Sequence, residues 1–237
     1  MANHFPGLGK YKRYTKALYD SCRSPKPSYS QHGEDAVIWD VLKAYDLRDS
    51  IYVDVGANHP SDISNSYLLY RNGLHGVIIE PNEELLGLFH KFRARDIPLM
   101  IGCSNVNTVL KFNISKTPVL SSFAKTRDVN TGRSQYVPVM KLDDAVQNIP
   151  FRFVSLLSID VEGLSVEVLA GAPSTIAKSL LVCIEFDRPE EKQAFATLLG
   201  NDFELLRNEG CNLLFINNRL KKSLCGDSDP LHDAHYK

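Results

Sequence analysis

Acidic residues directly follow several apolar segments of the chain. Segments of this kind, rich in β-branched residues, are typical of strands that are buried on both faces of a parallel sheet. The acids at their ends are Asp54, Glu80, Asp160 and Glu185. Because the carboxyl ends of parallel strands meet at one edge of an α/β sheet, we expect these carboxylates to surround one ligand, whose hydroxyls or amine they could bind.

The turn after the first of these strands carries Asp54 and Gly56. A glycine lets the backbone approach a ligand closely, so we expect both residues to form the floor of the site. The alternative is that Asp54 caps a loop or the next helix. Glu80 lies 80 − 54 = 26 residues further on, the spacing at which a second acid meets a nucleoside ribose. Glu80 could instead open the helix that follows it, but Pro81 fixes the turn and favours the ligand role.

The segments that carry these acids predict the fold class. Strands are expected near residues 51, 77, 98, 153 and 181, with helices between most of them and a hairpin over 203–206 and 213–216. This order predicts an α/β fold in which a mostly parallel sheet is completed by a terminal antiparallel hairpin.

Several shorter segments lead to more local expectations. An apolar pattern predicts a helix over 61–70, a single strand over 97–105 and an added antiparallel strand over 107–114. Residues 115–134 lack periodicity, which indicates a functional loop or lid. Residues 135–142 predict an extended segment at a sheet edge, because Pro138 has no N–H to donate.

The composition excludes some classes of partner. With 27 basic and 28 acidic side chains the formal net charge is −1, so we expect no nucleic acid and no membrane surface as partner. No apolar run is long enough to span a bilayer, and the first residues lack the pattern of a signal peptide; both observations favour a cytoplasmic location. The five cysteines are far apart and lack zinc-site spacing, so reduced core thiols are expected.

Several motifs, taken in order and spacing, resemble those of the FkbM-type methyltransferases across residues 28–217. They are SQHGED at 30–35, DVGANHP at 54–60, SNSY at 64–67, EPN at 80–82, and IDVEG at 159–163 with EVL at 167–169. The resemblance implies the class I, Rossmann-like methyltransferase fold with a seven-stranded sheet. It also implies S-adenosylmethionine as cofactor and methyl transfer to a hydroxyl of a sugar, a glycan or another natural product.

The resemblance further implies roles for individual residues. The turn of Asp54, Gly56 and Asn58 would bind the methionine part of the cofactor, and Glu80 its ribose hydroxyls. Ser104 would lie beside the adenine, and Asp160 would face the methionine amine or the acceptor. Three more polar residues border apolar stripes and could line the same pocket: Gln31, Glu34 and Asn65.

Methyl transfer to an alcohol is helped by a base. The candidates at the expected ligand edge are His59, Asp160, Glu162 and Glu185. His59 has the ordinary pKa closest to neutrality, although a loop histidine packed beside Pro60 is the alternative. Asp160, Glu162 and Asp187 could instead converge on Mg²⁺, which prefers oxygen ligands and would lower the pKa of the acceptor hydroxyl.

Two other functions would use the same strand-end acids. An oxidoreductase of the NAD type is disfavoured because the glycine pattern G-x-G-x-x-G is absent after Gly56. A binding module that has kept the fold without catalysis is the other alternative.

Domain boundaries follow from the same motifs. Residues 1–27 are expected to form a basic arm, 28–220 a methyltransferase domain and 221–237 a tail. The expected partner is a small-molecule or glycan acceptor. The sequence leaves the oligomeric state open, with a homo-oligomer among the alternatives.

Overall fold

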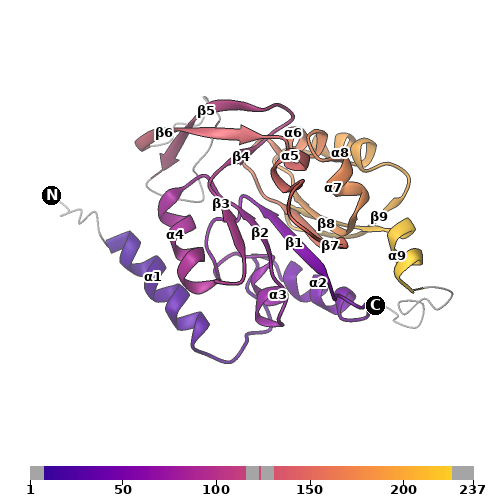
Figure 1. Cartoon of the computed structure of the whole chain (residues 1–237), viewed down its shortest axis with the longest axis horizontal. Helices are drawn as coiled ribbons and strands as arrows, with labels where there is room; N and C mark the ends of the chain where they lie inside the picture. The colour runs from indigo at the N-terminus through magenta and orange to yellow at the C-terminus, as the bar shows by residue number, and fades with distance from the viewer. Residues whose placement is uncertain (1–7, 116–122, 124–130, 226–237) are drawn as a thin grey trace.

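The structure, a computed structural model of the chain, describes residues 8–115, 123 and 131–225. Seven strands form its main sheet in the order β3-β2-β1-β7-β8-β10-β9 (Figure 1). They are β1 (Ser50–Val55), β2 (Gly76–Ile79), β3 (Ile97–Leu99), β7 (Phe153–Ile159), β8 (Ser179–Glu185), β9 (Phe203–Glu209) and β10 (Asn212–Asn217). Among these strands, β10 alone runs in the direction opposite to the other six. The predicted mostly parallel sheet with a terminal hairpin is therefore confirmed.

The chain changes direction across the sheet between β1 and β7. The strands β1, β2 and β3 follow one another outward on one side, and the chain then returns to place β7 on the other side of β1. In open α/β sheets, ligands bind outside the carboxyl ends of the strands at such a switch point. The topology therefore predicts a ligand-binding site at the carboxyl ends of β1, β2 and β7.

Helices cover both faces of this sheet. Alternate strand residues divide between two apolar clusters: Tyr52 and Ile78 belong to one and Val53 and Val77 to the other. The first cluster includes residues of α2 (Glu34–Leu42), α3 (Tyr67–Arg71) and α4 (Glu83–Phe92); the second includes residues of α5 (Leu142–Val146), α6 (Ser165–Ala170), α7 (Pro173–Ala177) and α8 (Glu191–Leu199). Burial on both faces explains why most residues of the central strands are apolar, with no alternation between apolar and polar residues.

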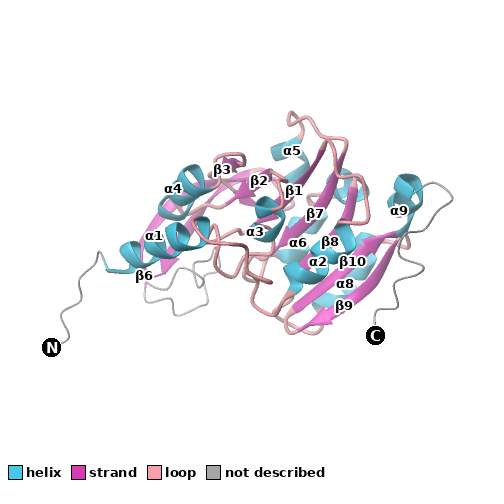
Figure 2. Cartoon of the chain, turned by 90° about the horizontal axis from the view of Figure 1, so that it is seen from below, coloured by secondary structure: helices cyan, strands magenta, loops and turns pink. Residues whose placement is uncertain are grey.

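Two helices lie at the ends of the described chain. Helix α1 (Leu8–Ser21) packs on α4, where the rings of Tyr14 and Phe92 lie 5.3 Å apart. Figure 2 shows α1 and α4 at one end of the molecule and the β9–β10 hairpin at the other. Helix α9 (Asn218–Cys225) runs across the boundary expected at residue 220, and the rest of the expected tail lies outside the described residues. In the described part of the chain, no helix combines the length and apolarity that crossing a bilayer requires.

A second, three-stranded sheet has the order β4-β6-β5. Its strands are β4 (Gly102–Cys103), β5 (Thr108–Ser115) and β6 (Thr131–Met140). The antiparallel strand predicted over 107–114 is confirmed by β5. The single strand predicted over 97–105 is wrong, because β3 pairs with β2 in the main sheet whereas β4 pairs with β6. Most of the lid predicted over 115–134 lies outside the described residues.

Two local expectations differ from the structure. Strand β6 lies between β4 and β5, so the edge position predicted from Pro138 is wrong. Within the described part of the chain, β4 pairs with Val139 and Met140 and with no earlier residue of β6, so Pro138 lacks a strand partner on that side and its missing N–H is tolerated. The helix predicted over 61–70 begins only at Tyr67; before it, Ile63 takes a positive φ of 52°, which no right-handed helix contains.

Candidate active site

A cavity of about 290 Å³ lies at the carboxyl ends of β1, β2, β7 and β8, and the small sheet forms part of its wall. Most of the residues that line it belong to four of the motifs, at 30–35, 54–60, 80–82 and 159–163, or to the small sheet. They are Gln31, Val55, Gly56, Asn58, Ile63, Ile79, Glu80, Pro81, Ile101, Gly102, Cys103, Phe112, Phe123, Asp160, Val161, Glu162, Leu164 and Glu185. The structure therefore brings seven of the predicted site residues to one cavity: Gln31, Gly56, Asn58, Glu80, Asp160, Glu162 and Glu185.

Glu80 has the most closely defined environment of these residues. Its Oε2 accepts a hydrogen bond from the backbone N–H of Asn58 at 2.9 Å, and its Oε1 accepts one from the N–H of Asn82 at 2.7 Å. Burial raises the pKa of Glu80 to about 7, although both hydrogen bonds oppose the rise. A carboxylate has about four lone-pair sites, so these two bonds leave about two acceptor positions of Glu80 for a ligand.

The turns after β1 and β7 touch at Gly56. The backbone N–H of Asp160 donates to the carbonyl of Val55 at 2.9 Å, and a Cβ at Gly56 would lie 1.9 Å from the backbone oxygen of Asp160. Gly56 also has a φ of 81°, where a side chain would be strained. Only glycine allows these two strand ends to meet, which places Asp160 beside the first turn.

Asp160 and Glu185 form a carboxyl pair. They follow adjacent parallel strands whose register aligns Ile159 with Ile184, and their side chains are hydrogen-bonded to each other. Burial is the main cause that raises the pKa of Asp160 well above its usual range, and the contact with Glu185 adds to it. The Sγ of Cys211 donates to Glu185 Oε1 at 3.2 Å. Two neighbouring carboxyl groups disfavour each other's charged form, which is the direction in which Glu185 acts on the pKa of Asp160.

The opposite wall of the cavity is apolar. Phe112 of β5 and Phe123 have ring centroids 4.8 Å apart, and Ile101 and Cys103 line the cavity with them. The small sheet is attached to the loop after β2, because Gln135 Nε2 donates to the carbonyl of Pro81 at 2.7 Å. This wall offers flat apolar surface close to Glu80.

Asp54 does not line the cavity, which differs from its expected place on the floor of the site. It accepts a hydrogen bond from the Ser66 hydroxyl, and a bond from Ser158 also reaches it. Burial raises the pKa of Asp54, while these bonds and the charge of Arg93 oppose the rise. Because Asp54 is still part of β1, its side chain follows the pleat onto the face where Tyr52 lies, away from the strand edge.

His59 also lies outside the set of residues that line the cavity. Its Nε2 lies 3.0 Å from the carbonyl of Arg13 in α1, and its Nδ1 accepts from the backbone N–H groups of Ser61 and Asp62. These bonds require the neutral tautomer with the proton on Nε2. Burial lowers the pKa of His59, which is consistent with that neutral form. Both ring nitrogens are thus engaged in holding α1 on the loop after β1.

The remaining predicted residues have other contacts. Glu34 accepts hydrogen bonds from His32 N–H and from Asn212 Nδ2, which joins the start of α2 to β10. The Nδ2 of Asn65 lies 3.3 Å from Ser158 Oγ. Ser104 is buried, and its N–H donates to the carbonyl of Met140.

The cation site expected from Asp160, Glu162 and Asp187 has no matching geometry. Asp187 is exposed and does not line the cavity. Among the described residues, no group of three or more His, Cys, Asp or Glu side chains is arranged to hold a metal ion.

The structure adds two residues that the sequence reasoning missed. Cys211 lies in the turn of the terminal hairpin, and it reaches Glu185 because Asn212 is aligned with Glu185 in the β8–β10 register. The hairpin pattern alone does not indicate this proximity, because the contact also needs the pairing of β10 with β8. Arg93 is completely buried and donates to Ser66 Oγ at 3.0 Å, and Ser66 in turn contacts Asp54. No local sequence signal marks Arg93, because its partners come from distant elements.

Comparisons with known proteins agree with this architecture. The family described as Methyltransferase FkbM domain matches residues 54–215. The structure of Methyltransferase FkbM from Methylobacillus flagellatus KT is similar with a TM-score of 0.50 and 13% identity, over 89% of this chain and 59% of that one. The present chain thus spans about three fifths of that protein, and a likeness at this identity concerns the fold alone.

A second solved structure, Precorrin-6y C5,15-methyltransferase from Geobacter metallireducens GS-15, is similar with a TM-score of 0.41 and 12% identity, over 83% of this chain and 93% of that one. A likeness this weak carries no argument. The search of curated proteins gave no match. The family match covers more than half of the 237 residues and includes the ends of β1, β2, β7 and β8, at which the cavity lies. On this evidence, the chain belongs to the FkbM methyltransferase family.

Proposed function

We propose that this protein is an S-adenosylmethionine-dependent O-methyltransferase whose acceptor is a hydroxyl of a sugar, a glycan or another natural product. The observation that carries the proposal is the placement of Glu80. Its carboxylate is held by two backbone N–H groups at the end of β2 and lines a cavity beside the switch point of the sheet. Family membership supports the methyl-transfer part of the proposal, and the acceptor class rests on the resemblance of the motifs.

The residues present suit an S-adenosyl group. The two free acceptor positions of Glu80 match the two hydroxyls of a ribose. The apolar wall at Phe112, Phe123 and Ile101 suits a flat adenine ring. When bound, the cofactor would supply a methyl group activated by its positively charged sulfur.

The Asp160–Glu185 pair is our candidate for the general base. It lies in the cavity, and it could accept the proton of an acceptor hydroxyl while the acceptor oxygen attacks the methyl carbon. Glu162 lines the cavity just beyond Asp160, and we assign it to binding acceptor hydroxyls. His59 is not assigned this role, because both of its ring nitrogens already bond to the backbone.

Enclosure of the site would contribute to the rate as well. Holding the reacting atoms in line can supply on the order of 7–11 kcal/mol of the barrier. The small sheet bonds to the loop after β2 through Gln135, so the cavity has a fixed wall on this side. This attachment would keep water away from the cofactor on the side of β2.

The direct test is methyl transfer from isotopically labelled S-adenosylmethionine to a panel of monosaccharides, oligosaccharides and hydroxylated natural products. We expect an O-methylated product and an equal amount of S-adenosylhomocysteine. Glu185→Gln should lower the rate about 100-fold or more, the usual contribution of a general base. A parallel series with EDTA tests the divalent cation separately.

If the cofactor binds but no member of a broad panel is methylated, the non-catalytic module becomes the better account. If labelled methyl appears on nitrogen or carbon instead of oxygen, the family assignment stands and the O-methyl assignment falls.

A further inference from the structure

Helix α1 presents three of its large apolar side chains to the outside of the molecule. Tyr11, Leu18 and Tyr19 are 70%, 43% and 49% exposed, and we call them the outer face of α1. They lie at positions i, i+7 and i+8, which share one face of a helix. The opposite face buries the small Ala17 and the acidic Asp20, each only 1% exposed. A helix that served only to cover the domain would bury its large apolar residues instead.

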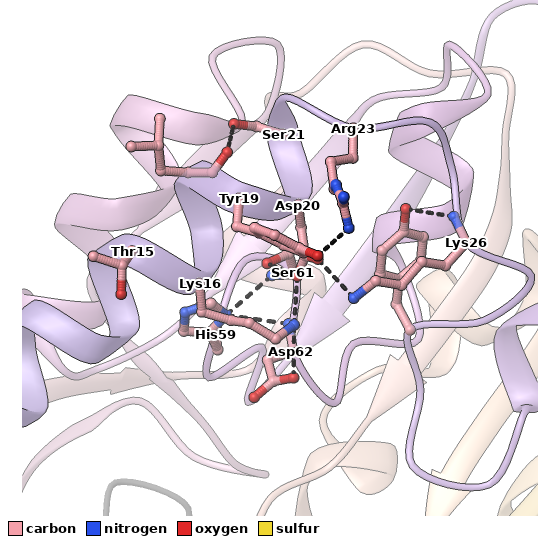
Figure 3. A network of polar contacts seen from close by, with 12 residues as sticks. Thr15, Lys16, Tyr19, Asp20, Ser21, Arg23, Lys26, His59, Ser61 and Asp62 are labelled. Atoms are coloured by element: carbon pink, nitrogen blue, oxygen red, sulfur yellow. Dashed lines mark hydrogen bonds and ion pairs between the residues drawn. The ribbon is translucent and has the colours of Figure 1, made fainter.

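The contacts of its inner side hold α1 in this orientation. The buried carboxylate of Asp20 lies 2.7 Å from Lys26 Nζ and accepts a hydrogen bond from Ser61 Oγ at 3.1 Å (Figure 3). Arg71 donates to the carbonyls of Asp20 and Arg23, both at 2.6 Å. The outer face cannot turn onto the domain without breaking these bonds. A fixed apolar face of this kind is typical of an interaction surface.

The segment that contains α1 is strongly basic. Residues 8–26 carry six basic side chains and one acidic one, a formal net charge of 6 − 1 = +5. The rest of the chain has 27 − 6 = 21 basic and 28 − 1 = 27 acidic side chains, a net charge of 21 − 27 = −6. The overall charge of −1, on which the expectation of no membrane partner rests, therefore averages over two oppositely charged parts.

Basic side chains border the outer face. Three of the six form ion pairs with acids of the described chain: Arg13, Lys16 and Lys26. The other three, Lys10, Lys12 and Arg23, are exposed and form no ion pair with any described residue. Lys12 directly follows Tyr11 in the helix. Arg23 donates to the hydroxyl of Tyr19, and its guanidinium carbon lies 4.5 Å from the centre of that ring.

This combination of side chains matches the surface of an anionic bilayer. Aromatic and aliphatic side chains on one face of a helix enter the boundary between headgroups and acyl chains, while basic side chains at its border reach the lipid phosphates. A second copy of the chain fits less well, because a twofold contact through this face would bring two segments of charge +5 together. A nucleic acid would use the cations but would leave Leu18 without an apolar partner.

We propose that the outer face of α1 docks on a membrane surface that contains anionic phospholipids. Docking of this kind needs no membrane-spanning helix. The side chains that would contact the lipids are Tyr11, Leu18 and Tyr19, with Lys10, Lys12 and Arg23 at their border. The inference goes beyond the proposed function and does not depend on it, because none of these residues lines the cavity.

The test is cosedimentation of the full chain with two kinds of vesicle, one of phosphatidylcholine alone and one of phosphatidylcholine mixed with phosphatidylglycerol. We expect binding to the mixed vesicles to be at least about tenfold tighter, because basic side chains are attracted to the anionic lipid. The binding should weaken as salt is added, since salt screens the attraction between exposed charges.

Two variants of α1 separate the charged and the apolar contributions. Lys10→Glu combined with Lys12→Glu should weaken binding to the mixed vesicles at least about tenfold. Tyr11→Gln combined with Leu18→Gln leaves the charge unchanged and keeps residues that favour a helix, and it should weaken binding by a similar factor.

The matched control is Lys141→Glu combined with Lys178→Glu. It changes the net charge as much as the lysine variant does, at exposed positions outside α1, and should change vesicle binding by less than about twofold. The thermal unfolding temperature and the Kd for S-adenosylhomocysteine should be the same in the native protein and in all three variants, because the replaced side chains are exposed and lie outside the cavity.

Several results would overturn the inference. These are no binding to the mixed vesicles, or binding that neither α1 variant weakens. Loss of binding in the lysine variant alone would indicate a general polyanion surface. Tighter binding of a single-stranded oligonucleotide than of the mixed vesicles would assign the face to nucleic acid. A dimer in sedimentation equilibrium that Tyr11→Gln with Leu18→Gln dissociates would assign it to a second copy. If the native protein does not bind S-adenosylhomocysteine, the proposed function fails and this inference stands.

Discussion

The carboxylate of Glu80 accepts a hydrogen bond from the backbone N–H of Asn58 at 2.9 Å, although the two residues belong to turns after different strands. This bond joins the turn after β1 to the turn after β2. Because Gly56 in the first turn also touches the Asp160 backbone, three strand ends are held together around one cavity.

Replacing Glu80 by Gln should weaken cofactor binding. An amide keeps one acceptor oxygen, loses the charge and turns an NH₂ group towards one of the two backbone donors. Since a hydrogen bond to a charged group contributes about 1.5–3 kcal/mol, we expect the Kd for S-adenosylhomocysteine to rise at least about tenfold by calorimetry. Glu83→Gln, at the exposed first residue of α4, should change the Kd by less than about twofold. An unchanged Kd in the Glu80 variant would remove Glu80 from the cofactor site.

The stability of the free protein should depend on the titration of Glu80. Burial raises the pKa of this carboxyl from 4.5 to about 7, so between these values the folded protein binds more protons than the unfolded chain. The stabilisation is complete below pH 4.5 and is lost as the pH rises towards 7, by up to about 3 kcal/mol. Urea unfolding at several pH values should show this loss in the native protein and not in Glu80→Gln, which shares every other titrating group. Parallel pH profiles for the two proteins would contradict the assignment.

Arg93 should be a large contributor to stability. It is fully buried, and its guanidinium bonds to Asp96 at 2.6 Å, Tyr52 at 2.8 Å and Ser66 at 3.0 Å. Arg93→Met would leave the Asp96 carboxylate buried without its cation, at a cost of about 3–5 kcal/mol in the free energy of unfolding. Arg95→Met, two residues away and exposed, should cost much less. A loss below about 1 kcal/mol for Arg93→Met would show that the network adjusts without its arginine.

Asp20 should control how firmly α1 is attached. Its carboxylate is completely buried and contacts Lys16, Lys26 at 2.7 Å and Ser61 at 3.1 Å (Figure 3). Burial alone would raise the pKa of Asp20, but its hydrogen bonds with Lys16 and Lys26 outweigh this effect and keep it ionised. In Asp20→Asn we expect amide hydrogen exchange in α1 to become about tenfold faster or more, by local opening.

The control for Asp20 is Asp40→Asn, because Asp40 forms an exposed pair with Lys43. That variant should leave exchange in α1 unchanged. Equal exchange in α1 for the native protein and Asp20→Asn would show that the apolar contact with α4 alone holds the helix.

Much of the fold could be predicted because strands that are buried on both sheet faces have mostly apolar sequences. The runs at β1, β7 and β8 are mostly apolar segments, and the acids after β2 and β7 lie where parallel strands end. Glu80 and Asp160 therefore reach the cavity as their positions predict. Cys211 was missed although the hairpin register brings it to Glu185, because that contact needs the pairing of β8 with β10 in addition to the hairpin.

The details of the site could not be predicted from the spacing of residues along the sequence. They depend on the direction of individual side chains and on contacts between distant segments. Asp54 lies in the last part of β1 and not after it, so the pleat turns it towards Ser66 and away from the cavity. His59 is engaged by Arg13 of α1, a contact over 46 residues. The division of residues 97–105 between two sheets depends on β6, which lies far along the chain.

The measurement that tests the central claim most directly is calorimetric titration of the native protein with S-adenosylhomocysteine. The account predicts one molecule bound per chain with a micromolar Kd, and a higher thermal unfolding temperature in its presence. No heat of binding and no thermal shift, with either this ligand or S-adenosylmethionine, would contradict it.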